Sequence, residues 1–113
     1  MTLLEELIEY SHNCIEDTAH VCQKHRWACE RFLRDVQRAK TKEFPYVFDE
    51  EKAQRFFNWA HLHRHTKGVL AGEPIDFVPI QRFIFGNVYG WVHQDTGLRR
   101  FRRAYWQVAR KNA

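Results

Sequence analysis

The stretch from Cys14 to Val36, CIEDTAHVCQKHRWACERFLRDV, decides the fold class of this chain. Its apolar residues recur at the spacing that places them on one face of an α-helix. The pattern predicts helix from about Thr2 to Lys40, with a break near Ser11–Asn13 and with Asn13 as the N-cap of a longer second helix. The predicted buried face of that helix contains Ile15, Ala19, Cys22, Cys29, Phe32, Leu33 and Val36.

Two further helices follow this region. Pro45 disfavours helix at the residue before it, and Asp49 is a suitable N-cap for a helix over residues 50–66. Gly68 would then supply the C-terminal stop. Pro79 suits the first turn of the next helix, which ends near residue 90. The predicted apolar faces are Ala53, Phe56, Phe57 and Ala60 in the first of these helices, and Ile80, Phe83, Ile84 and Val88 in the second.

The end of the chain has a different pattern. HQDTG at residues 93–97 is typical of a turn. FRRAYWQVA at 101–109 is almost continuously apolar toward its end, which predicts a strand buried on both faces of a parallel sheet. The expected class is therefore mainly α with short β segments (α+β). We expect one incomplete domain over residues 1–113, with helices in 1–45, a helical region in 46–90, and a turn and strand in 91–113.

The charge of the chain is uneven. Residues 1–35 contain seven acidic and four basic residues, whereas residues 36–113 contain seven acidic and fourteen basic ones. A basic C-terminal part is typical of proteins that bind phosphate, in a nucleotide or in DNA, although a solvated basic surface has the same composition. No apolar run approaches the roughly 20 residues of a membrane span, no signal peptide is recognisable, and the three cysteines are typical of free thiols.

Metal and catalytic motifs are incomplete. His12, Cys14, His20, Cys22, His25 and Cys29 lie close together in the sequence. Zinc needs about four converging ligands and no CxxC pair is present, so we favour buried core cysteines and expect no metal site, with zinc binding as the open alternative. HLHRH places His61 and His65 one helical turn apart but lacks the glutamate of HExxH, which favours a polar helix face. The sequence contains no GxSxG motif and no paired carboxylates. It therefore gives no indication of a self-contained catalytic site.

Several ordered motifs in the second half of the chain carry a family resemblance. They are the acidic helix leading to HTKG (65–68), AG (71–72), PIQRFI (79–84), GNVYGW (86–91), TGLRRFRRAY (96–105) and ARKNA (109–113), preceded by RWACERFLRDV (26–36). In this order they strongly resemble the N-terminal part of tailed-bacteriophage terminase large subunits, over about residues 20–113. VARKNA is similar to a variant Walker A motif, the phosphate-binding loop that normally reads G-x-x-x-x-G-K-[ST].

The resemblance implies a packaging motor. Terminases of this family pump double-stranded DNA into procapsids with a P-loop ATPase domain and cut it with a nuclease domain, so the parent is a hydrolase. They self-associate and act with the portal protein and the small terminase subunit in the cytoplasm of the bacterial host. This chain would be the helical lid part of the P-loop α/β ATPase domain, ending in the strand that leads to the phosphate loop and cut within the Walker A motif.

The resemblance also assigns residue roles. Gln81 matches the glutamine that reads adenine, since an amide both donates and accepts hydrogen bonds. Val108, Ala109, Arg110, Lys111, Asn112 and Ala113 match the phosphate loop, and Ala113 stands where glycine is commoner. Arg110 would stabilise charge on the transferred phosphoryl group in the full-length parent. ATP and Mg²⁺ are expected as ligands of that parent, whereas this chain alone is expected to bind neither and to be inactive.

An alternative function needs no parent protein. The chain would then be a small basic interaction protein that binds a motor subunit, or DNA through Arg99, Arg100, Arg102 and Arg103. In either case a lone central strand would expose its edges. We therefore expect residues 101–109 either to mediate self-association or to dock against the helices as a hairpin, without any membrane contact.

Overall fold

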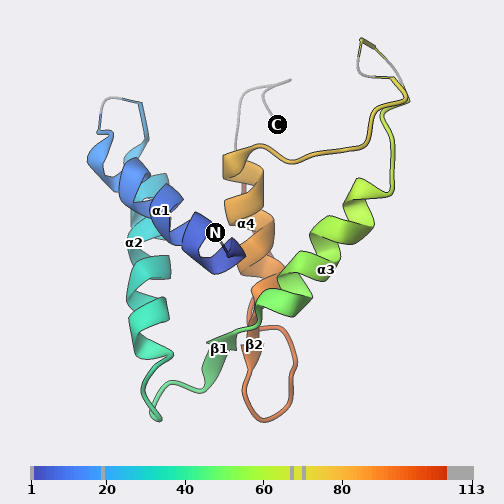
Figure 1. Ribbon diagram of the computed structural model, residues 1–113. Helices are drawn as coiled ribbons and strands as arrows, with labels where there is room; N and C mark the ends of the chain where they lie inside the picture. Colours follow the sequence, from blue (N-terminus) through green and yellow to red (C-terminus); the bar gives the residue numbers. More distant parts are fainter. Residues whose placement is uncertain (1, 19, 67, 70, 107–113) are drawn as a thin grey trace.

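The computed structural model describes residues 2–18, 20–66, 68–69 and 71–106 (Figure 1). This part of the chain forms four helices and a two-stranded antiparallel sheet, and the sheet lies at one end of the molecule (Figure 1). The predicted class, mainly α with short β segments, is confirmed. The elements are α1 (Leu3–Glu16), α2 (Gln23–Arg38), β1 (Tyr46–Phe48), α3 (Glu50–His61), α4 (Pro79–Gly90) and β2 (Trp91–His93).

Helices α1 and α2 form a hairpin whose turn lies later than predicted. Thr2 caps α1 through a reciprocal capping box with Glu5. The expected break near Ser11–Asn13 is wrong, because the Ser11 hydroxyl donates to the Leu7 carbonyl at 2.8 Å and so remains within the helix. Helix α2 begins at Gln23, with Cys22 as its N-cap.

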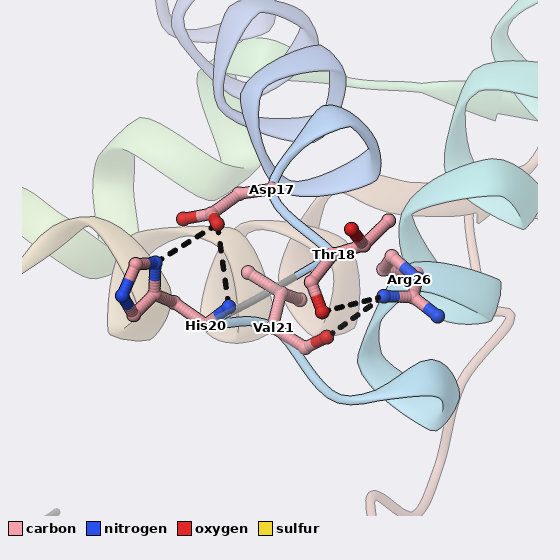
Figure 2. Close-up of polar contacts among 5 residues, drawn as sticks. All are labelled: Asp17, Thr18, His20, Val21 and Arg26. Carbon is pink, nitrogen blue, oxygen red and sulfur yellow. Dashed lines mark hydrogen bonds and ion pairs between the residues drawn. The ribbon is translucent and has the colours of Figure 1, made fainter.

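The turn between α1 and α2 is held by its own polar contacts (Figure 2). The Asp17 carboxylate accepts from the backbone and the ring Nδ1 of His20, at 3.3 and 3.0 Å. Arg26 in the first turn of α2 donates to the carbonyls of Thr18 and Val21, at 3.4 and 3.1 Å. These bonds satisfy backbone groups of the turn that neither helix pairs, and they fix how α2 returns along α1.

An aromatic core joins α2 and α4 to the sheet. Phe32 contacts Phe83 and Trp91 edge to face, with ring centroids 5.7 and 6.3 Å apart. Of the predicted buried face, Cys29 and Phe32 are buried, whereas Ile15, Leu33 and Val36 are half-buried, Cys22 is exposed and Ala19 lies outside the described residues. The Cys22 prediction is wrong because this residue precedes α2 and so does not share its buried face.

Two glycines let α4 pack closely against its neighbours. A Cβ on Gly86 would lie 2.8 Å from Leu7 Cδ1 of α1, and one on Gly90 would lie 2.7 Å from Phe48 Cζ of β1 and still closer to Cε2 of the same ring. Both separations are shorter than a van der Waals contact. The two residues are buried, so only glycine fits without displacing the neighbouring side chain. In the predicted stripe of α4, Phe83 is buried, and Ile80, Ile84 and Val88 are half-buried.

Helix α3 is shorter than expected. Asp49 caps it as predicted, accepting from the backbone of Glu51 and Lys52. The helix ends at His61 because the following residues pair with a later segment, through an Arg64–Pro74 bridge and a 3.0 Å bond from His65 N to the Glu73 carbonyl. His61 and His65 therefore do not lie one helical turn apart, and Gly68, at φ +81°, belongs to this loop.

The predicted strand at 101–109 is wrong for its described part, residues 101–106, which form no strand. One edge of β2 pairs with β1. Val92 of β2 also forms a bridge with Arg99, so the segment around Arg99 occupies the position where a third strand would pair. Residues 101–106 instead pack beside α2 and α4. The Arg31 guanidinium lies 5.1 Å from the Phe101 ring centroid. The ring centroids of Trp106 and Phe85 lie 6.4 Å apart. Docking against the helices, one of the two predicted outcomes, is thus observed for these residues.

We expect Gly90→Ala to lower the free energy of unfolding by about 1–3 kcal/mol, because the added methyl group forces the Phe48 ring out of its position. The measurement is urea denaturation followed by circular dichroism. Arg55→Ala, at an exposed position of α3, is the control and should change stability by less than about 0.5 kcal/mol. Equal stability of Gly90→Ala and the unmodified chain would contradict the tight packing of α4.

Candidate functional site

A buried ion pair connects α2 to the chain that follows β2. The Asp35 side chain is 2% exposed and accepts from Arg100 Nη1 at 2.7 Å. Arg38 adds a longer contact of 3.5 Å to the other carboxylate oxygen. The Arg100 guanidinium carbon lies 4.8–5.9 Å from the ring centroids of four aromatic residues, a distance range in which cation–π attraction operates. These rings belong to Phe44, Tyr46, Trp91 and Phe101.

The four arginines predicted to contact DNA therefore have different environments. Arg99, Arg102 and Arg103 are exposed, and Arg99 also lies over the Tyr89 ring at 5.4 Å. Arg100 is 19% exposed and is bound to Asp35. Sequence reasoning did not single out Asp35. Its signal was an acidic residue three positions after Phe32, on the apolar face of the predicted helix, and that signal does not identify a partner 65 residues away.

Residues 101–106 close one side of a cavity of about 680 Å³. Its other walls come from α2 and α4, and its volume lies in the range of small-molecule sites. The cationic side chains of Lys24, Arg31 and Arg103 line it together with the rings of Phe83 and Trp106. The buried indole N–H of Trp106 has no hydrogen-bond partner within the described ranges. The cavity thus combines apolar walls and positive charge.

Gln81 is not among the residues that line this cavity. It lies in the first turn of α4, where its Oε1 accepts from the Val78 backbone N–H at 3.1 Å. This is one half of a capping box, and the other half cannot form because valine has no side-chain acceptor. The Gln81 carbonyl thus stabilises the start of α4. The predicted phosphate-loop residues Val108, Ala109, Arg110, Lys111, Asn112 and Ala113 lie outside the described part of the chain.

A second group of chemically active side chains lies between α1 and α2. One ligand atom each from Cys14, His25 and Cys29 lies within 4.8 Å of the other two. Burial, reinforced by Cys14, raises the pKa of the Cys29 thiol to about 12, and burial lowers the pKa of His25. Of the six histidines and cysteines that lie close together in this part of the sequence, the hairpin brings Cys14, His25 and Cys29 together.

The comparisons with known proteins concern the C-terminal third of the chain. Residues 79–113 match the family described as terminase large subunit, ATPase domain. No curated protein and no solved structure matches the chain. The matched segment begins at the first residue of α4 and includes β2 and the basic segment after it. This part of the chain is recognised as terminase large-subunit ATPase domain, in agreement with the resemblance. None of the described helices is long and apolar enough to cross a membrane.

Arg100→Ala is expected to lower the free energy of unfolding by about 3 kcal/mol or more, because it leaves the Asp35 carboxylate buried without its principal partner. Thermal and urea denaturation measure the loss. Arg102→Ala, which removes the same side chain from an exposed position two residues later, should stay within about 0.5 kcal/mol. If the two variants were equally stable, the ion pair would not hold the C-terminal segment in place.

Proposed function

We propose that this chain supplies the first part of the ATPase domain of a terminase large subunit, the motor that uses ATP to package DNA. The observation that carries the proposal is the match of residues 79–113 to that domain. In the parent protein the motor would act on double-stranded DNA as a self-oligomer, with the portal protein and the small terminase subunit as partners. Nuclease activity would belong to a separate domain of the same protein.

The start of α4 is the described part of the proposed nucleotide site. Gln81 is half-buried there, and its one recorded bond uses the carbonyl oxygen. An amide carbonyl has a second lone pair, and the amide nitrogen has two donors, so Gln81 retains the groups needed to hydrogen-bond an adenine edge. In the proposal, residues 108–113 form the phosphate loop, Arg110 stabilises developing charge, and Mg²⁺ is held by groups of the complete domain.

The test is calorimetric titration of a non-hydrolysable ATP analogue into this chain joined to its natural continuation through the ATPase domain. We expect binding by the extended protein, about tenfold weaker binding in Gln81→Ala, which loses roughly two hydrogen bonds, and weaker binding in Arg110→Ala. Gln81→Glu separates the two roles of this side chain, because it keeps an acceptor for Val78 N but has no amide donor.

The controls distinguish an effect on binding from an effect on folding. Gln54→Ala, at an exposed position on α3, should bind the analogue as the unmodified protein does. Gln81→Glu should unfold at an unchanged temperature yet bind weakly. An extended protein that binds no nucleotide would reject the proposed function, and normal binding by Gln81→Glu would reject the adenine role of Gln81 alone.

Direct DNA binding is the second candidate, supported by the exposure of Arg99, Arg102 and Arg103 on one short segment. Each phosphate contact releases counterions, so the slope of log affinity against log salt should shrink by about 0.9 for each arginine replaced by alanine. The measurement is fluorescence anisotropy of labelled duplex DNA at several salt concentrations. Lys42→Ala, at an exposed position between α2 and β1, is the control for general charge loss. Unchanged slopes in the arginine variants would exclude this interface.

A further inference from the structure

We propose that Cys14, His25 and Cys29 form a structural metal site, with Zn²⁺ as the preferred ion, that joins α1 to α2. Cys14 lies in the last turn of α1, and His25 and Cys29 lie one turn apart near the start of α2. The site is separate from the residues matched to the terminase family, which begin at Pro79. It therefore does not depend on the proposed nucleotide or DNA binding.

The positions of the donor atoms suit a tetrahedral ion. The three ligand atoms lie within 4.8 Å of one another. With metal–sulfur bonds of about 2.3 Å and metal–nitrogen bonds of about 2.0 Å, neighbouring ligands of a tetrahedral zinc lie about 3.3–3.8 Å apart. The remaining difference of about 1 Å is small enough for rotation of the side chains, so the helices can keep their positions.

The donor types select the class of ion. Two thiolates and one imidazole favour zinc over calcium or magnesium, which prefer oxygen ligands. Cys29 is 0% exposed and Cys14 is 8% exposed, so an ion here would be shielded from water. A divalent cation would balance the charge of the two thiolates, and the thiol protons would pass to solvent on binding.

One neighbouring hydroxyl group contacts the site. The Tyr10 hydroxyl lies 2.9 Å from His25 Nε2, and the Tyr10 and His25 ring centroids lie 5.9 Å apart. This oxygen therefore contacts one of the three ligands and is placed to orient His25 or to act as the fourth ligand. Such outer contacts fix the ligand orientation in protein metal sites.

The turn between the helices holds the two halves of the site together. The contacts of Asp17 with His20 and of Arg26 with Thr18 and Val21 span this turn (Figure 2). His20 is thereby occupied and exposed, and Cys22 is exposed at the start of α2. These two residues have the same chemistry as the proposed ligands and are close to them in sequence, but they do not belong to the three-residue group, so they are matched controls.

The first experiment titrates the reduced, metal-free chain with zinc chloride and, separately, with cobalt(II) chloride. We expect one ion per chain, and for cobalt a thiolate charge-transfer band together with the visible bands of tetrahedral cobalt. Loss of an outer contact typically weakens metal binding 10–100-fold, so Tyr10→Phe should weaken it by about tenfold. Loss of a ligand has a larger effect than loss of an outer contact. Cys14→Ser, Cys29→Ser and His25→Gln should therefore each weaken metal binding by at least about 100-fold. Cys22→Ser and His20→Gln should bind as the unmodified chain does.

The second experiment identifies the ligands without altering them. In zinc-edge X-ray absorption of Cys22→Ser, two sulfur ligands at about 2.3 Å and nitrogen or oxygen ligands at about 2.0 Å are expected, and the only thiols left in this variant are Cys14 and Cys29. The proposal is overturned if the unmodified chain shows no cobalt–thiolate band or binds less than one zinc. It is also overturned if Cys22→Ser removes binding, or if its zinc carries fewer than two sulfur ligands.

Discussion

The bond between Asp35 and Arg100 is the contact on which the arrangement of the C-terminal segment depends. A carboxylate that is 2% exposed has a large desolvation cost, and that cost is offset only if a cation reaches it with good geometry. Arg100 does so while its planar guanidinium lies against four aromatic rings. A lysine would provide the charge but not the planar stacking surface. The Arg100 side chain thus fixes the positions of α2, the sheet and the segment after β2 relative to one another.

This constraint shapes the cavity between α2, α4 and residues 101–106. Because Arg100 is held in place, Phe101 and the residues up to Trp106 run beside α2 and α4 and close the cavity between them. His25 lines that cavity and also belongs to the group with Cys14 and Cys29. The proposed metal site and the cavity are therefore adjacent through one imidazole. An ion that fixes His25 would also fix one wall of the cavity, so the α1–α2 hairpin supports the segment that leads toward residues 107–113.

The sequence predicted local features well and long-range ones poorly. Asp49 as an N-cap, Pro79 at the start of a helix and the turn at residues 93–97 follow from backbone chemistry within a few residues, and all are observed. The break near Asn13 and the strand at 101–106 were wrong. In the first case a serine hydroxyl was satisfied inside the helix; in the second, Arg99 already bridged Val92 of the neighbouring strand. Both outcomes depend on the hydrogen-bonding partners that the folded chain offers at these positions.

By itself, the sequence determined the helical character, the basic C-terminal part and, through the ordered motifs after Pro79, the likeness to the terminase ATPase domain that the family match supports. These properties reside in composition and spacing, which need no knowledge of distant contacts. Only the tertiary structure decided that Arg100 is internal while its arginine neighbours are exposed. It likewise placed Cys14, and not Cys22, beside His25 and Cys29. The environment of each residue depends on the position of the α1–α2 turn and on the packing of α2 against the sheet. Side chains of the same type, such as Cys14 and Cys22, therefore differ only in the residues that the fold places next to them.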